Sequence, residues 1–340
     1  MERVPPRLVR RLIVDPIVFV IAVVGLLLSP VVLLVAAIVD LFVPGRFRTS
    51  RLLAVLVVFL VLELVGIVVG FVLWIASGFG LALRAESFQN AHHRFIAWWL
   101  ERLIGAATKL LGLRIELEDV PAPKAGAVLV FPRHAGPGDS LLIARTLMSG
   151  YKRRPRIVMK ETMQWAPTID IIGNRLQACF IRPADRDASR FIERIGGLAK
   201  GLGSQDAVVL FPEGGNFSLR RRERAIAKLR ESGREDYAAR AEGMSHLLAP
   251  RPGGALAAIE SAPAADVVFV AHTGLEYLSS TPDLWRAVPL QAPIVGRYWR
   301  VEPKDIPDGR DEQIDWLYSW WSTIDTWIES HAHMYRAPTG

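Results

Sequence analysis

The sequence predicts an α/β protein with a mixed, mainly parallel sheet flanked by helices, preceded by an N-terminal two-helix membrane hairpin. Short apolar runs alternate with helical segments from residue 114 onward. Continuous apolar runs such as Ala207–Phe211 indicate strands that are buried on both faces, which is typical of parallel sheets. Two much longer apolar stretches come first, and each is long enough for a helix to cross a bilayer.

Composition narrows the class of partner. The chain has 340 residues and a formal charge of +7, and 51% of its residues are hydrophobic. Together these values favour a membrane surface or anionic ligands. Nucleic acid is not expected, because no zinc-ligand spacing, RNP-like motif or basic helical region is present. Cys179 is the only cysteine, so no intrachain disulfide can form. No metal or bound cofactor is expected, and composition does not predict an oligomeric state.

The predicted hairpin consists of the apolar stretches Pro16–Val39 and Leu52–Leu83, joined by a short polar link. Basic residues outside both stretches favour the cytoplasmic side for the two ends, and therefore for the rest of the chain. Three arginines in the link argue for the opposite orientation, or for a hairpin that dips into the bilayer without crossing it. Glu63 is the one charge in the second stretch, and it should be protonated, paired with an arginine or turned toward protein.

The chain is expected to have three parts. Residues 1–85 form the hairpin, residues 86–305 the α/β domain, and residues 306–340 a tryptophan-rich helix that packs on the domain or on the membrane surface. An amphipathic helix, Glu86–Leu111, opens the α/β domain, and its adjacent His92 and His93 are expected at the surface.

Within the α/β domain, apolar runs and helical periodicity predict alternating elements. The predicted strands are Arg114–Glu118, Ala127–Phe131, Arg156–Met159, Ala178–Ile181, Ala207–Phe211, Val267–His272 and Ile294–Val301. The predicted helices are Ser140–Ser149, Glu161–Asn174, Ala188–Leu202, Leu219–Ser232 and Gly254–Ser261.

Two glycine-rich loops follow predicted strands. The segment Phe131–Ser140 reads FPRHAGPGDS and carries His134 and Asp139, and a second strand ends in Glu213–Gly215. Strand ends at such turns are where α/β proteins commonly bind ligands. The spacing of His134 and Asp139 alone is weak, since Asp139 could simply cap the next helix. The second charged glycine loop strengthens the interpretation that the pair is catalytic.

The two loops together resemble the glycerolipid acyltransferase family, which includes the 1-acylglycerol-3-phosphate acyltransferases. RHAGPGD and FPEGGN stand where the family has its first and third blocks. The segment Ala178–Arg182 resembles the second block, and His246–Gly254 resembles the stretch that precedes a generic fourth block at Val267–Ala271. The resemblance extends from Glu86 to Val301, and a preceding hydrophobic hairpin is typical of the membrane-bound members.

The resemblance implies a membrane-bound enzyme that moves a fatty acyl group from acyl-CoA or acyl carrier protein to the free hydroxyl of a lysophospholipid. Lysophosphatidic acid, which would give phosphatidic acid, is the first choice of acceptor. The resemblance implies that His134 and Asp139 are catalytic. The expected substrate-binding residues are Arg133, Gly136, Gly138, Arg182, Arg186, Glu213, Gly214 and Gly215.

The sequence departs from the family at the expected phosphate site. Arg133 replaces the usual asparagine, and Gly215–Asn216 replace the usual Thr-Arg pair. Other arginines are therefore candidates to bind phosphate, and they are Arg182, Arg186, Arg220, Arg221 and Arg222.

The chemistry also follows from the residue types. A histidine can take the proton of an alcohol that attacks a thioester, and an aspartate can fix the histidine tautomer and stabilise the imidazolium. Backbone N–H groups around Gly136 and Gly138 are candidate donors to the oxyanion. His272, at the end of an apolar strand, is expected to be a satisfied core histidine.

Two other functions remain open. Residues 138–141 spell GDSL, which would make Ser140 the nucleophile of a serine esterase. That interpretation needs an aspartate three residues from a histidine near the C-terminus, and neither His331 nor His333 has one. A non-catalytic membrane-surface adaptor would account for the hairpin and the basic charge, but it would leave both glycine loops unexplained.

Overall fold

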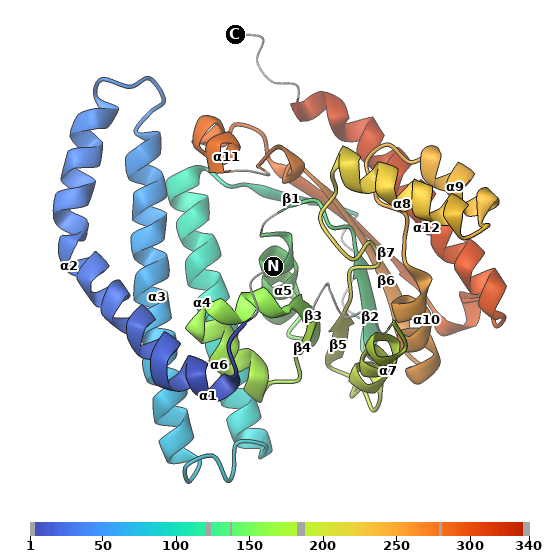
Figure 1. Ribbon diagram of the computed structural model, residues 1–340, viewed down its shortest axis with the longest axis horizontal. Coiled ribbons are helices and arrows are strands. Elements are labelled where there is room, and N and C mark those ends of the chain that lie inside the picture. The colour runs from blue at the N-terminus through green and yellow to red at the C-terminus, as the bar shows by residue number, and fades with distance from the viewer. Residues whose placement is uncertain (1–3, 120–123, 137, 182–187, 279–280, 336–340) are drawn as a thin grey trace.

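The computed structural model describes residues 4–119, 124–136, 138–181, 188–278 and 281–335 (Figure 1). Its centre is a seven-stranded sheet in the order β1-β7-β6-β2-β5-β3-β4. The strands are β1 (Ile115–Glu118), β2 (Val128–Pro132), β3 (Arg154–Lys160), β4 (Cys179–Ile181), β5 (Asp206–Val209), β6 (Asp266–Thr273) and β7 (Ile294–Val301). Strands β6, β2, β5, β3 and β4 are mutually parallel, whereas β7 is antiparallel to β6 and β1 is parallel to β7. The predicted fold class is confirmed.

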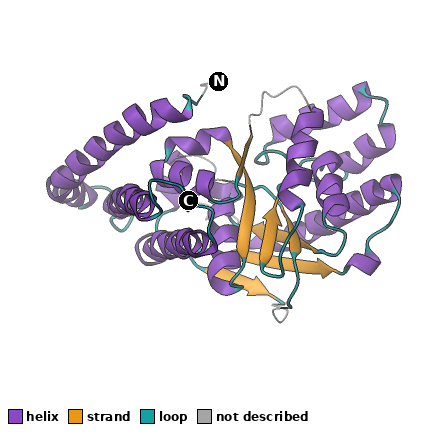
Figure 2. Cartoon of the chain, turned by 90° about the horizontal axis from the view of Figure 1, so that it is seen from below, coloured by secondary structure: helices purple, strands orange, loops and turns teal. Residues whose placement is uncertain are grey.

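Helices cover both faces of the sheet (Figure 2). One side carries α7 (Ala188–Ala199), α8 (Leu219–Glu231), α9 (Glu235–Glu242), α10 (Pro252–Ser261) and α12 (Arg310–His331). The other carries α4 (Glu86–Leu111), α5 (Asp139–Arg145) and α6 (Pro167–Arg175). Side chains of β2 alternate between the two layers, with Leu129 and Phe131 in the first and Val128 and Val130 in the second. Continuous burial of this strand explains its unbroken apolar sequence.

Short elements complete the chain and include two that the sequence did not predict, α9 and α11 (Thr281–Ala287). The predicted helix Glu161–Asn174 is divided into a 3₁₀ turn, Glu161–Trp165, and α6, which begins at Pro167. A π turn, Thr146–Gly150, extends α5. The remaining turns are Glu276–Leu278, Pro303–Asp305 and Ala332–Tyr335.

The tryptophan-rich helix α12 packs against the sheet. Trp320 stacks on Phe269 of β6 with ring centroids 4.7 Å apart, and Leu317 and Trp321 are fully buried. Of the two contacts expected for this helix, the structure shows the one with the α/β domain.

The N-terminal segment forms an antiparallel helical hairpin beside this domain (Figure 1). After α1 (Arg7–Val9) and a π turn, Arg10–Val14, come α2 (Asp15–Asp40) and α3 (Arg48–Ala76). Both are long and apolar enough to cross a membrane. Large apolar side chains on α2 are exposed, such as Leu27 at 74%. The hairpin is compatible with membrane association.

Helix α3 approaches α6 closely through two glycines one turn apart. A Cβ atom on Gly66 would lie 1.9 Å from Thr168 Oγ1, and one on Gly70 would lie 2.7 Å from Ile171 Cγ2. Glu63 lies on the same face of α3, where its Oε2 accepts a hydrogen bond from the Thr168 amide at 3.0 Å. Of the alternatives considered for Glu63, the structure shows the side chain turned toward protein.

A buried ion cluster reinforces this contact. Asp170 of α6 is fully buried, and its two carboxylate oxygens bind Arg10 at 2.9 Å and Arg11 at 2.6 Å. Arg175, at the end of α6, donates to the Gly70 carbonyl at 2.7 Å. The hairpin is therefore held to the α/β domain by polar contacts as well as by close packing.

Candidate active site

His134 and Asp139 form a hydrogen-bonded pair at the carboxyl edge of β2. The distance from His134 Nδ1 to Asp139 Oδ2 is 2.7 Å. The amides of Ala135 and Gly136 also donate to Oδ2, at 3.1 and 3.3 Å, and the Ser140 amide donates to Oδ1 at 2.6 Å. An ionised carboxylate only accepts hydrogen bonds, so Nδ1 carries the proton and Nε2 is left as the basic nitrogen.

Asp139 is kept ionised by its partner. Burial raises the pKa of this carboxyl group, but the hydrogen bond from His134 and the charge of that imidazole outweigh burial and hold the pKa below its usual value. Asp139 is only 2% exposed, so bulk water competes little for the contact with His134. Asp139 is the first residue of α5, and its side chain also accepts the amide of the next residue, Ser140.

The glycines of the first loop are required by its shape. A Cβ atom on Gly136 would lie 2.9 Å from the Leu275 carbonyl oxygen, and Gly138 adopts a left-handed φ of +97° directly before α5. Both line the cavity that His134 faces. The Gly136 amide donates to Asp139, so it is not available to an oxyanion. The Gly138 amide remains the predicted hydrogen-bond donor to the oxyanion.

Glu213 is placed behind the catalytic loop and not on its substrate side. It is 1% exposed, its Oε1 accepts the His134 amide at 2.6 Å, and its Oε2 accepts the Leu248 amide at 2.9 Å. Both carboxylate oxygens of Glu213, for which a contact with substrate was predicted, therefore join loops of the protein. Burial raises the pKa of Glu213 to about 7, against the lowering effect of these amides and of Arg133.

Arg133, which the sequence suggested for the substrate headgroup or for the border of the loop, is also buried. It is 1% exposed, and it donates to the carbonyl oxygens of His272 at 2.6 Å and His246 at 3.1 Å. Glu276 Oε1 lies 3.4 Å from the same guanidinium group. In this chain the residue before the catalytic histidine joins loops that are more than 100 positions apart in sequence.

Glu213→Gln is expected to remove a pH dependence of stability. The pKa of Glu213 in the folded state, about 7, lies above its ordinary value of 4.5, so the folded state binds this proton more tightly than the unfolded state. The resulting stabilisation is complete below pH 4.5 and is lost as the pH rises through about 7. In detergent, the Tm of the wild type relative to the variant should therefore fall across this range. Glu223→Gln, at an exposed site on α8, is the control, and parallel Tm curves for wild type and Glu213→Gln would contradict the assignment.

Two arginines flank the second glycine loop. Gly214 has a φ of +70°, and a Cβ atom on it would lie 3.1 Å from the Arg251 guanidinium group. A Cβ atom on Gly215 would lie 3.5 Å from Arg221 Nη1. Arg251 was not among the predicted site residues, although it lies in the stretch His246–Gly254 that resembles the family.

The other candidate phosphate-binding arginines differ in placement. Arg222 donates to the carbonyl oxygens of Met244 and Glu242, both at 2.6 Å, and it is therefore engaged away from the loop. Arg220 is exposed at the start of α8. Arg182 and Arg186 lie outside the described residues.

The pair faces a cavity of about 400 Å³ between the sheet and α4, α5 and α6. Its walls are mostly apolar, and its polar lining residues include His134, Asp139 and Ser140. Representative wall residues are Ile96, Trp99, Leu141, Ala144, Met148, Ile157 and Ile172. His93 also lines the cavity and His92 is fully buried, so their predicted surface placement is wrong. Among the described residues, no group of three or more His, Cys, Asp or Glu side chains is placed to hold a metal ion.

The serine-esterase arrangement is not assembled around Ser140. Its hydroxyl donates to Asp139 Oδ1 at 3.2 Å, and the imidazole of His134 is bound through Nδ1 to that same aspartate. His331 near the C-terminus instead contacts Glu118 at 2.9 Å. Ser140 therefore lacks the histidine that an esterase nucleophile needs.

A histidine held by a buried aspartate, facing an apolar cavity, is the arrangement of an enzyme that activates a hydroxyl group for attack on an acyl carbon. A protein-family model described as Acyltransferase matches residues 114–271, which include both glycine loops. Residues 114–271 thus match an acyltransferase domain, which supports the resemblance to the glycerolipid acyltransferases seen in the motifs.

One solved structure is similar in its arrangement of elements. It is the 1-acyl-sn-glycerophosphate (LPA) acyltransferase PlsC from Thermotoga maritima, at 14% sequence identity and a TM-score of 0.46. The match covers 81% of this chain and 98% of that chain. A likeness this distant does not identify the substrates of this chain. No curated protein matches the sequence significantly.

Proposed function

We propose that this acyltransferase moves a fatty acyl group from acyl-CoA or acyl carrier protein to the free hydroxyl of a lysophospholipid, with lysophosphatidic acid as the first choice. The observation that carries the proposal is the His134–Asp139 pair at the apolar cavity. In the proposed reaction, His134 Nε2 takes the hydroxyl proton while the oxygen attacks the thioester carbon. The C–O bond forms, the C–S bond breaks, and the imidazolium returns its proton to the thiolate.

Several features support this reaction. The apolar walls of the cavity suit a fatty chain, and the aspartate stabilises the imidazolium that forms during attack. The Gly138 amide is the candidate donor to the tetrahedral oxyanion. Helices α2 and α3 would anchor the enzyme in the bilayer that supplies its acceptor, with the catalytic domain on the cytoplasmic face.

An acceptor panel tests the proposal. The purified full-length chain would be incubated with isotope-labelled acyl-CoA or acyl carrier protein and lysophospholipids of several headgroups, and the products resolved by mass spectrometry. We expect labelled phosphatidic acid to form fastest. A faster reaction with another lysophospholipid would overturn the choice of acceptor alone. The absence of labelled product from every acceptor would favour a membrane-surface adaptor.

The phosphate of the acceptor is expected to bind between Arg251 and Arg221. Arg251→Gln should raise KM for lysophosphatidic acid about tenfold while changing kcat little, because a charged hydrogen bond contributes about 1.5–3 kcal/mol and acts on substrate binding. Arg224→Gln, on the exposed side of α8, is the matched control. Equal KM values for the two variants would place the phosphate elsewhere.

A further inference from the structure

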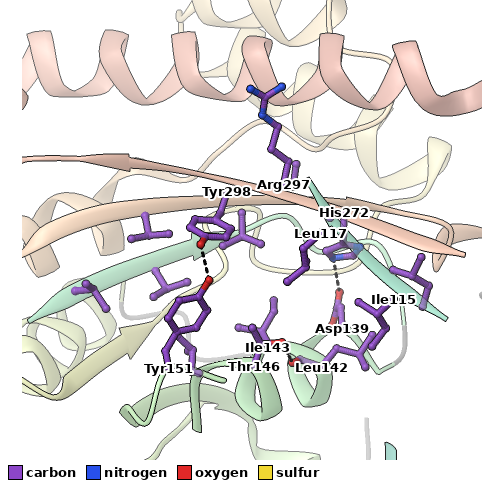
Figure 3. A pocket seen from close by; sticks show the side chains of 18 of the residues that line it. Ile115, Leu117, Asp139, Leu142, Ile143, Thr146, Tyr151, His272, Arg297 and Tyr298 are labelled. Atoms are coloured by element: carbon purple, nitrogen blue, oxygen red, sulfur yellow. Dashed lines mark hydrogen bonds and ion pairs between the residues drawn. The ribbon is translucent and has the colours of Figure 1, made fainter. Parts of the chain in front are cut away.

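A second cavity, of about 140 Å³, lies on the opposite side of α5 from the cavity at His134. Figure 3 shows the side chains that line it. The sheet forms one wall through β1, β7, β6 and β2, and α5 with its following π turn forms the other. Most of the lining is apolar, and representative residues are Ile115, Leu117, Val130, Leu142, Ile143, Val270 and Leu275.

Helix α5 separates the two cavities. Leu141 and Ala144 face the catalytic cavity, whereas Leu142 and Ile143 face the second one. Asp139 borders both, but His134 borders only the catalytic cavity. A molecule in the second cavity would therefore contact the aspartate of the catalytic pair without reaching the basic nitrogen of the histidine.

One end of the second cavity holds an unsatisfied histidine. His272 is 6% exposed, and neither of its ring nitrogens has a hydrogen-bond partner among the described residues. The expectation of a satisfied core histidine is therefore wrong. Its Nε2 lies 4.0 Å from Asp139 Oδ2, too far for a direct hydrogen bond but spaced for one atom to bridge them (Figure 3). Burial and the charge of Arg133 lower the pKa of His272 to about 4, so its imidazole is neutral at pH 7 and offers one donor and one acceptor.

The other end carries a hydrogen-bonded pair of tyrosines, Tyr151 and Tyr298 (Figure 3). The cationic side chains in the lining are already bound there. Three pair with carboxylates, as Lys124–Glu302, Arg297–Asp119 and Arg300–Asp266. Arg153 donates to the backbone carbonyl oxygens of Gly126, Ser204 and Lys124. All four cationic side chains at this end are therefore engaged by groups of the protein.

The dimensions suit one extended hydrocarbon chain. The cavity follows β6 from Val268 to His272, and the four residue steps between them span about 13 Å at roughly 3.3 Å per step. A volume of about 140 Å³ over that length corresponds to a narrow slot.

We propose that the second cavity binds an uncharged single-chain lipid that carries a hydroxyl group, such as a fatty alcohol. The hydroxyl hydrogen-bonds to His272 Nε2 beside Asp139, and the chain lies along β6 toward Tyr151 and Tyr298. An anionic headgroup is excluded at the first end by the charge of Asp139. Binding in this cavity does not depend on the proposed acyl transfer. If that reaction is correct, occupancy should lower kcat without raising KM for the acceptor, because the bound molecule contacts the aspartate that holds His134.

Photolabelling of the full-length protein tests the site directly. The probe is a 1-decanol analogue with a diazirine on its chain, and adducts are mapped by mass spectrometry. We expect saturable labelling of the peptides that contain Tyr151, Val270 and Tyr298. Excess 1-decanol should compete about tenfold better than decane or decanoate. Labelling confined to α4 and α6, labelling that does not saturate, or equal competition by decanoate would overturn the proposal.

Two substitutions on opposite sides of the wall between the cavities provide matched variants. Thr146→Phe fills the second cavity and should reduce labelling about tenfold, whereas Ala144→Phe fills the catalytic cavity and should leave labelling unchanged. His272→Phe keeps a ring of similar size and should abolish the preference for 1-decanol over decane. Loss of labelling in Ala144→Phe alone would assign the probe to the catalytic cavity and overturn the proposal. The positions of the adducts in the wild-type protein test the proposal even if a variant fails to fold. Because labelling requires no acyl transfer, its failure is distinguishable from failure of the proposed function.

Discussion

Replacing His134 with alanine is expected to reduce kcat for acyl transfer by about 10²–10⁴-fold, the usual contribution of a general base. The substitution removes the nitrogen that accepts the hydroxyl proton. The main-chain contacts of the loop to Glu213 and Phe217 do not use the imidazole, so the fold and membrane insertion should be retained. Transfer of labelled acyl groups by the purified protein measures the effect, and circular dichroism checks the fold.

Ser140→Ala is the matched control for this experiment. It removes a hydroxyl group that contacts only the far oxygen of Asp139, so most of the transferase activity should remain. Full activity in His134→Ala would contradict the mechanism. Loss of activity in Ser140→Ala together with survival of His134→Ala would instead favour the serine esterase.

Asp139→Asn is expected to lower kcat by about 10²–10⁴-fold with little change in KM. The amide keeps the shape of the side chain but removes the charge that stabilises the imidazolium. If its NH₂ group faces Nδ1, the histidine is also forced into the tautomer that protonates Nε2. Steady-state kinetics with varied acceptor measures the two parameters separately.

The same variant distinguishes catalysis from helix capping. Asparagine can still support the start of α5, since it is a favoured residue near helix N-termini. A role in capping alone therefore predicts nearly unchanged kcat and at most a small fall in Tm. A raised KM at constant kcat would mean that Asp139 contacts substrate.

The strands and the contact between His134 and Asp139 could be predicted because their causes are local. Apolar runs marked the strands, most clearly β2 and β5, which are almost completely buried, and the glycine loops that follow these two strands marked the candidate site. The antiparallel return of β7 beside β6 has no such local signature. The division of the predicted helix 161–174 into a 3₁₀ turn and α6 has only one local signal, which is Pro167 at the start of α6.

The directions of side chains could not be predicted because they depend on distant segments. Arg133 and Glu213 have residue types that suit a headgroup site, yet both point into the protein and hold loops that meet only in the folded chain. His272 looked like an ordinary core histidine because the slot beside it is formed by four strands and α5 together. The role of Arg251 depends on the approach of its loop to Gly214.

Because α3 contacts α6 closely, the N-terminal hairpin supports one wall of the cavity at His134. Helix α6 supplies Ile172 and Gly173 to the wall of the catalytic cavity, and its opposite side rests on Gly66 and Gly70 of the hairpin. A chain that began at residue 86 would expose this side of α6 to solvent. It would also lack Arg10 and Arg11, the partners of the buried carboxylate of Asp170. The hairpin thus supports the wall of the cavity, and a chain that lacks it would need a redesigned α6 surface as well as the deletion.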